Sequence, residues 1–186
     1  MLVVKFIWRD DGMPIFEDRW KYDPEYLSYV SDLINNEKFR QLDKIVHHHH
    51  TTRFKHSVYV SYVSYRIARR MGLDARATAR AGLLHDFFLE SREDIQLMQE
   101  GSHNDVHPKL ALKNALTLTE LSDKEKDIIL KHMFLCSKSN FPRYRESYIV
   151  TSVDKYCAMD EVSRPLRSRV IAKYHSLKGA LSTTQA

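Results

Sequence analysis

A histidine followed directly by an aspartate, His85-Asp86, closes an otherwise apolar segment of the chain. The four residues before the pair, Ala81-Gly82-Leu83-Leu84, are small or aliphatic and predict a buried helix. An imidazole and a carboxylate are costly to bury without polar partners. The fold must therefore bring other groups to this pair, either hydrogen-bonding partners within the core or further ligands around a metal ion.

Capping residues and apolar periodicity predict helices over most of the chain from Asp23 onward. Asp23-Pro24 joins an N-cap residue to a proline at the first helical position, and Ser122-Asp123-Lys124-Glu125 forms a capping box. Gly72 ends the strongest apolar stripe. We expect one helix from residue 24 and others over residues 37–46, 54–71, 75–86, 108–115, 123–133, 147–159 and 164–177, with a looser stretch over 91–106.

Residues 1–22 differ from the rest of the chain. Their loose alternation around Val4, Phe6 and Trp8, followed by Asp11-Gly12, predicts an extended arm or a short hairpin. Residues 23–186 contain no linker and no internal repeat, and 186 residues suffice to bury one core. The expected fold is all-α: a single helical domain over residues 23–186, preceded by the arm or hairpin.

The composition argues against a membrane or nucleic-acid protein. Charged residues interrupt every apolar run before it reaches the roughly 18 residues of a spanning helix. The N-terminus lacks the basic start and cleavage site of a secretory signal, and two cysteines cannot form a disulfide framework. The net charge of +5 suits phosphorylated ligands, but the basic residues are scattered and form no stripe for nucleic acid. We expect a cytoplasmic protein.

Two further residues extend the His85-Asp86 pair into a pattern. His56 lies near the start of the helix predicted over 54–71, and Asp154 lies in an apolar-flanked helix. The order His, His-Asp, Asp on separate helices resembles the HD-domain superfamily of metal-dependent phosphohydrolases. The resemblance covers roughly residues 47 to 160. It implies a helical HD domain in which His56, His85, Asp86 and Asp154 bind a metal ion.

Two more histidines are similar to those of the binuclear branches of this superfamily. His107 precedes the helix predicted from Pro108, and His132 lies late in the next helix. In binuclear members, histidines at corresponding points bind a second metal ion. The pattern resembles the branch that hydrolyses nucleotides such as diadenosine tetraphosphate. The segments around His85, His132 and Asp154 look still more like a bacterial group of HD-domain proteins.

The chain also departs from the superfamily pattern. It has no GYP motif, and His132 is followed by Met133 rather than a second histidine. Both departures argue against a cyclic-di-GMP phosphodiesterase of the HD-GYP kind. Many members carry a lysine shortly after the His-Asp pair, whereas this chain continues with Phe87-Phe88-Leu89-Glu90. No lysine-assisted step is therefore expected at that point.

The ligand types indicate the kind of metal. Four histidines and two aspartates favour iron, zinc, manganese or nickel over magnesium, which prefers oxygen ligands. If Asp86 bridges two ions, His56, His85 and Asp154 complete one site, and His107 and His132 complete the other. Two ions about 3.5–4 Å apart could share a hydroxide and bind a phosphoryl oxygen. Asp86 is then the residue on which catalysis depends most.

Three basic residues are candidates for holding a substrate phosphate. Arg53 and Lys55 lie near His56, where they would equally suit a solvated helix start. Lys155 follows Asp154 but points about 100° away from it on a helix, which makes it a weaker candidate.

The remaining histidines carry weaker patterns. We expect the run from His47 to His50 to form an exposed loop, from which His50 alone could approach the site. His103 and His175 have no patterned context, so we assign them no role.

Three functions are compatible with these patterns. The first is a phosphohydrolase with one or two divalent transition metal ions, acting on a nucleotide or another small phosphoester. The second is a non-catalytic HD domain that binds a nucleotide or a metal as a sensor. The third is a basic helical adaptor for nucleic acid or protein, in which the His and Asp residues are structural. The intact ligand set favours the first.

Overall fold

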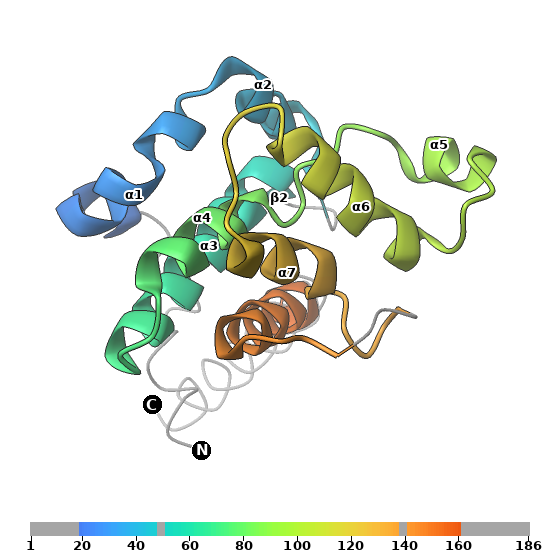
Figure 1. Ribbon diagram of the computed structural model, residues 1–186. Coiled ribbons are helices and arrows are strands. Elements are labelled where there is room, and N and C mark those ends of the chain that lie inside the picture. Colours follow the sequence, from blue (N-terminus) through green and yellow to red (C-terminus); the bar gives the residue numbers. More distant parts are fainter. Residues whose placement is uncertain (1–18, 48–50, 138–140, 161–186) are drawn as a thin grey trace, which may run out of the picture.

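The computed structural model describes residues 19–47, 51–137 and 141–160 (Figure 1). Over these residues the chain is largely helical, which confirms the all-α prediction. The β-structure there is a two-residue antiparallel ladder between β1 (Val46–His47) and β2 (Thr51–Thr52). Most of the predicted arm and the helix predicted over 164–177 fall outside the described residues, so the proposed domain division stays a prediction.

The helices follow one another with short connections. In chain order they are η2 (Arg19–Tyr22), α1 (Pro24–Ile34), α2 (Glu37–Arg40), η3 (Gln41–Lys44), α3 (Arg53–Arg70), α4 (Ala75–Leu84), α5 (Arg92–Leu97), α6 (His103–Ala115), α7 (Asp123–Lys131) and a helix over residues 145–160. The predicted caps form as expected. Asp23 accepts a hydrogen bond from the N–H of Tyr26, and Ser122 forms a capping box with Glu125.

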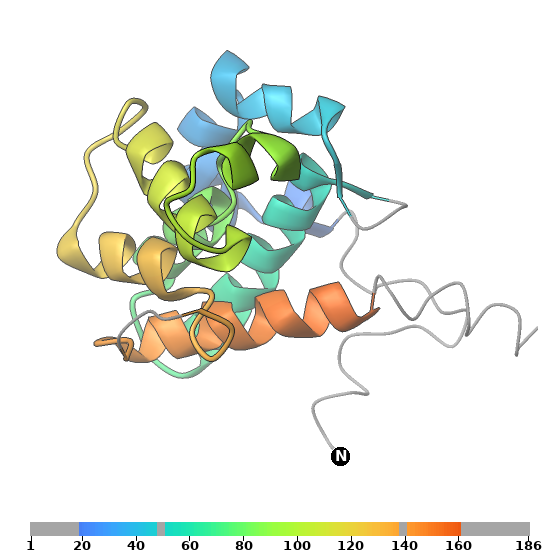
Figure 2. The same cartoon turned by 90° about the vertical axis from the view of Figure 1, so that its right-hand side faces the viewer.

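Helices α3 and α4 form the centre of the bundle (Figure 1). Helices α1, α6 and α7 all pack against α4, and the helix over residues 145–160 lies beneath α3 and α7 (Figure 2). Apolar side chains from all these helices share one core, and Phe88, Ile95 and Val106 form a smaller one between α5 and α6. Among the described helices, none is both long and apolar enough to cross a membrane.

A glycine allows the two central helices to approach closely. A Cβ atom built at Gly82 of α4 would lie only 3.1 Å from the Cα atom of Ser61 in α3. The hydroxyl of Ser61 donates to the carbonyl of Ala79 at 2.6 Å and accepts from the Tyr26 hydroxyl at 2.8 Å. This tight contact brings the C-terminal end of α4, which carries His85, beside α3.

Helix α6 corrects one prediction. It begins at His103 rather than at Pro108, because Ser102 and Asp105 form a capping box that starts the helix earlier. Pro108 lies inside the helix, where it removes only the N–H that would bond to the Asn104 carbonyl. His107 is therefore a helical residue and does not precede the helix.

Two other segments also differ from the prediction. The single helix predicted over residues 37–46 is divided into α2, the 3-10 helix η3 and the first strand. The looser stretch over residues 91–106 contains α5, which starts at a capping box formed by Ser91 and Asp94. In both segments local capping residues set where the short helices begin: Asn36 before α2 and Ser91 before α5.

Candidate metal centre

Six buried histidine and aspartate side chains come together from five parts of the fold. Each of the six residues is at most 9% exposed. They are His56 in α3, His85 at the C-cap of α4, Asp86 directly after it, His107 in α6, His132 at the C-cap of α7 and Asp154 in the helix over residues 145–160. These are the six ligands that the sequence predicts.

One part of the cluster gathers around Asp154. Its Oδ1 lies 3.1 Å from His56 Nε2 and 3.5 Å from His85 Nε2. His85 Nε2 also lies 3.7 Å from Asp86 Oδ2. His56, His85 and Asp154 thus form one group whose spacing is compatible with a bound metal ion.

The other part gathers on the opposite oxygen of Asp86. Asp86 Oδ1 lies 3.4 Å from His107 Nε2 and 3.5 Å from His132 Nε2. The two imidazole Nε2 atoms are 2.9 Å apart. Asp86 therefore stands between the two parts of the cluster and directs one oxygen toward each.

Backbone carbonyls orient three of the imidazole rings. His85 Nδ1 lies 2.8 Å from the carbonyl oxygen of Gly82, and His107 and His132 make the same contact, also at 2.8 Å, with carbonyls of their own helices. Because a carbonyl only accepts, each Nδ1 carries a proton, and Nε2 is the ring atom that faces the cluster and is bare whenever the ring is neutral. This is the tautomer in which histidine binds a metal through Nε2.

The cluster shifts the pKa values of both carboxylates. Burial raises the pKa of Asp86, but the imidazoles of His85, His132 and His107 outweigh that effect and hold it well below the usual range. Burial also raises the pKa of Asp154, and the neighbouring imidazoles of His56 and His85 lower it far more. Both carboxylates are therefore ionised and able to bind a cation at neutral pH.

Two buried atoms in the cluster lack a hydrogen-bond partner. They are His85 Nε2 and Asp86 Oδ1, one a nitrogen donor for metals and the other an oxygen donor. Buried polar atoms without partners are uncommon and call for an explanation. A divalent transition metal ion would satisfy both, and the mixed imidazole and carboxylate donors suit such an ion. The residues present therefore fit a metal ion.

The predicted phosphate-binding residues lie at different depths. Arg53 is buried: its guanidinium stacks on the Phe88 ring at 3.6 Å and donates to the Phe88 carbonyl, while its Nε has no hydrogen-bond partner. Lys155 is half-buried, and its Nζ donates to the carbonyl of His132 at 3.1 Å. Lys55 is exposed.

Two histidines beside the cluster were not predicted as site residues. His103 stacks on His107 with ring centres 4.8 Å apart, a contact that the four-residue spacing on one helix could have indicated. His47 is half-buried with its ring 4.3 Å from that of His56, so the exposed loop expected for this run is wrong at His47. His48, His49 and His50 lie outside the described residues.

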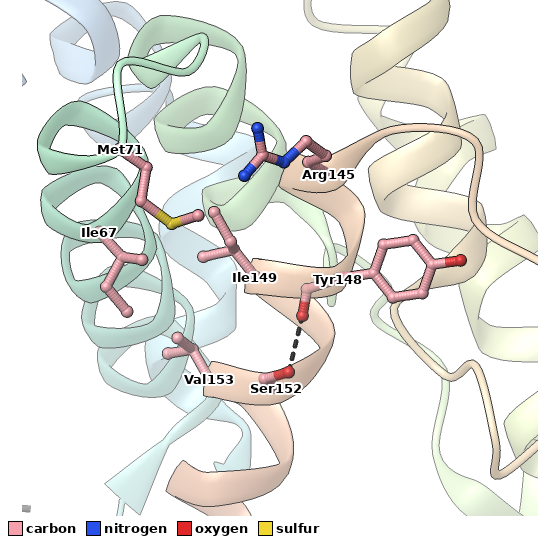
Figure 3. Close-up of a pocket in the computed structure, with 7 residues that line it drawn as sticks. All are labelled: Ile67, Met71, Arg145, Tyr148, Ile149, Ser152 and Val153. Atoms are coloured by element: carbon pink, nitrogen blue, oxygen red, sulfur yellow. Dashed lines mark hydrogen bonds between the residues drawn. The ribbon is translucent and has the colours of Figure 1, made fainter. Parts of the chain in front are cut away.

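An open groove lies elsewhere, between α3 and the helix over residues 145–160 (Figure 3). It is lined by Ile67, Met71, Arg145, Tyr148, Ile149, Ser152 and Val153. None of the predicted site residues is among them. Ile67 lies about 16 Å along α3 from His56, whereas Val153 directly precedes Asp154 in the chain.

The comparison with known families agrees with this geometry. Residues 53–164, more than half of the chain, match the HD domain. The chain belongs to the HD-domain family. The match spans His56, His85, Asp86, His107, His132 and Asp154. HD domains bind divalent metal ions and are typically metal-dependent phosphohydrolases. Searches of curated proteins and of solved structures find no match.

Proposed function

We propose that this HD domain is a metal-dependent phosphohydrolase that acts on a nucleotide or another small phosphoester. The observation that carries the proposal is the position of Asp86 between two groups of donors. Its Oδ2 faces His85, and its Oδ1 faces His107 and His132. A carboxylate that directs one oxygen to each of two histidine groups suits a bridge between two metal ions.

The chain would hold the ions with few rearrangements. His56, His85 and Asp154 would hold one, His107 and His132 would hold the other, and Asp86 would contact both. When bound, such ions supply a water deprotonated near neutral pH and polarise a phosphoryl oxygen. The side chains of Asp86 and Asp154 retain 9% and 12% exposure, which marks the side from which a substrate would approach.

Arg53 is the best-placed of the basic residues to position a phosphate. Burial lowers its pKa, whereas the charges of Asp86 and Glu90 raise it, so the guanidinium lies in the field of the proposed bridging carboxylate. The Phe88 ring and carbonyl fix its orientation. A guanidinium held in one orientation suits a phosphate oxygen, and its positive charge would offset the charge of the substrate. Lys155 would act mainly by supporting the backbone of His132.

A hydrolysis screen tests the proposal. Purified protein is incubated with nucleoside mono- and diphosphates, with dinucleotides and with small phosphate esters. Each reaction contains Mn²⁺, Fe²⁺, Zn²⁺ or Ni²⁺. We expect phosphate or nucleotide release that a chelator abolishes and that the added metal restores. Binding of a nucleotide without turnover under every metal would instead support a sensor, and absence of bound metal would contradict the proposal.

A further inference from the structure

His47 reaches the proposed metal centre from outside the helices. The ladder pairs His47 with Thr51, and the Thr51 hydroxyl donates to the His47 carbonyl at 3.3 Å. Helix α3 begins at Arg53, whose N–H donates to the carbonyl of Ile45 at 2.9 Å. The segment before α3 is thus held back against the first turns of that helix, where His56 lies.

The donor atoms of three residues then come within reach of one ion. His47, His56 and Asp86 each offer one donor atom, and these atoms all lie within 4.8 Å of one another. Two donors that are each about 2.1 Å from a metal lie at most about 4.2 Å apart, so a small side-chain rotation would suffice.

We propose that His47 is a further metal ligand, which binds the same ion as His56 and Asp86. This inference rests on the proposed metal centre but not on hydrolysis. The ion would then have three protein donors, His47, His56 and Asp86. His56 also belongs to the neighbouring group with His85 and Asp154. Two imidazoles and a carboxylate are donors that suit iron, manganese, nickel or zinc.

The competing explanation is that His47 only stacks on His56. The two rings are inclined by 42° at a centre-to-centre distance of 4.3 Å, which an aromatic ring without a donor atom could also adopt. Two substitutions separate ligation from stacking. His47→Phe keeps a ring but removes the donor, and His47→Asp removes the ring but keeps a donor.

The measurement is the affinity for Co²⁺, followed by its visible absorption in competition with a chelator. It is made on the parent protein and on His47→Phe, His47→Asp and His47→Ala. We expect His47→Phe and His47→Ala to bind the ion at least about 10- to 100-fold more weakly, because even removal of a residue that only orients a ligand costs about that much. His47→Asp should stay within a few-fold of the parent.

The opposite ranking would overturn the inference. If His47→Phe keeps the affinity of the parent while His47→Asp loses it, the role of His47 is stacking. If all three variants bind as the parent does, His47 is not a ligand, and the proposed metal centre stands without it. If the parent itself binds no Co²⁺, the metal centre fails together with this inference. Circular dichroism of each variant checks that a weaker affinity is not caused by unfolding.

Discussion

His107 and His132 face each other through Nε2 atoms 2.9 Å apart, while Nδ1 of each ring is bonded to a carbonyl of its own helix. If both rings were neutral, the lone pairs of the two Nε2 atoms would face and repel each other. The contact therefore requires a positive charge. Burial lowers the pKa of His107 to about 3, and Asp86 raises the pKa of His132 despite its burial. A proton on one of the rings or a bound metal ion would supply this charge.

Removal of His107 should therefore cost one ion and leave the other. We expect His107→Gln to lower the metal content from two ions per chain toward one, because His56, His85 and Asp154 remain in place. Metal analysis after gel filtration measures the content. His103→Gln is the matched control, since His103 stacks on His107 but is not one of the six residues assigned to the two ions. An unchanged metal content in His107→Gln would contradict a second site at this pair.

Asp86 should affect metal binding and hydrolysis together. As the proposed bridge it contacts both groups, so Asp86→Asn should lose most of the bound metal and reduce turnover at least about 100-fold. Asp127→Asn is the control. Asp127 is also buried, but it accepts hydrogen bonds from Arg143 N and the Ser147 hydroxyl. An Asp86→Asn protein with full metal and normal turnover would place the catalytic centre elsewhere.

Arg53 should affect substrate binding without changing metal content. We expect Arg53→Gln to lower kcat/KM about 10- to 100-fold, mainly through KM, since one charge-assisted hydrogen bond contributes about 1.5–3 kcal/mol. Lys55→Gln should change KM much less, because Lys55 is exposed. Steady-state kinetics and metal analysis of both variants test this. If Arg53→Gln matches the parent in KM, another group binds the phosphate.

The sequence predicts best those features that depend on local chemistry. The N-cap at Asp23, the capping box at Ser122 and the limits of α3 are local, and the structure confirms them to within one residue. The His-Asp pattern identifies the family, because each of its residues lies within or directly beside a recognisable helical segment. These predictions require no knowledge of tertiary contacts.

The features that the sequence did not predict depend on contacts between segments. His47 reaches His56 only because the short ladder turns the chain back before α3, and no spacing in the sequence encodes that contact. The burial of Arg53 depends on Phe88, which lies 35 residues away. The start of α6 is a different case, because both the capping box at Ser102 and Pro108 are visible in the sequence, and the helix begins at the capping box.

Gly82 should be the position where α3 and α4 tolerate added volume least. In Gly82→Ala the new Cβ would lie 3.1 Å from the Cα of Ser61, and that backbone atom is fixed within a buried helix. Forcing this contact costs about 2 kcal/mol, whereas the helix propensity of alanine favours the variant by about 1 kcal/mol. We therefore expect the free energy of unfolding to fall by about 1 kcal/mol. Gly82→Val should lose about 3 kcal/mol. Chemical denaturation measures both, and a stabilised Gly82→Ala protein would show that the helices can move apart.

A buried carboxylate should make the stability fall in acid. Glu146 accepts hydrogen bonds from the backbone N–H of Asp74 at 3.1 Å and from Lys124 Nζ at 2.9 Å. Burial raises the pKa of Glu146, but these bonds outweigh it and leave the pKa below its usual value. The ionised form therefore stabilises the fold at neutral pH, and this contribution disappears as the pH falls through the lowered pKa.

Glu146→Gln should remove that part of the pH dependence. At pH 7 we expect a loss of about 1 kcal/mol, because the amide oxygen can still accept a hydrogen bond but the charge opposite Lys124 is gone. In acid, below the usual range of a glutamate, the parent and the variant should converge. The carboxylates of Glu146 and Asp74 raise the pKa of Lys124 despite its burial, so Lys124 keeps its charge to high pH. The stabilities of the two proteins should therefore not converge between neutral and mildly alkaline pH. Urea denaturation of both proteins across the acid range measures the difference between their free energies of unfolding. If that difference stays constant down to the lowest pH, ionised Glu146 is not its source.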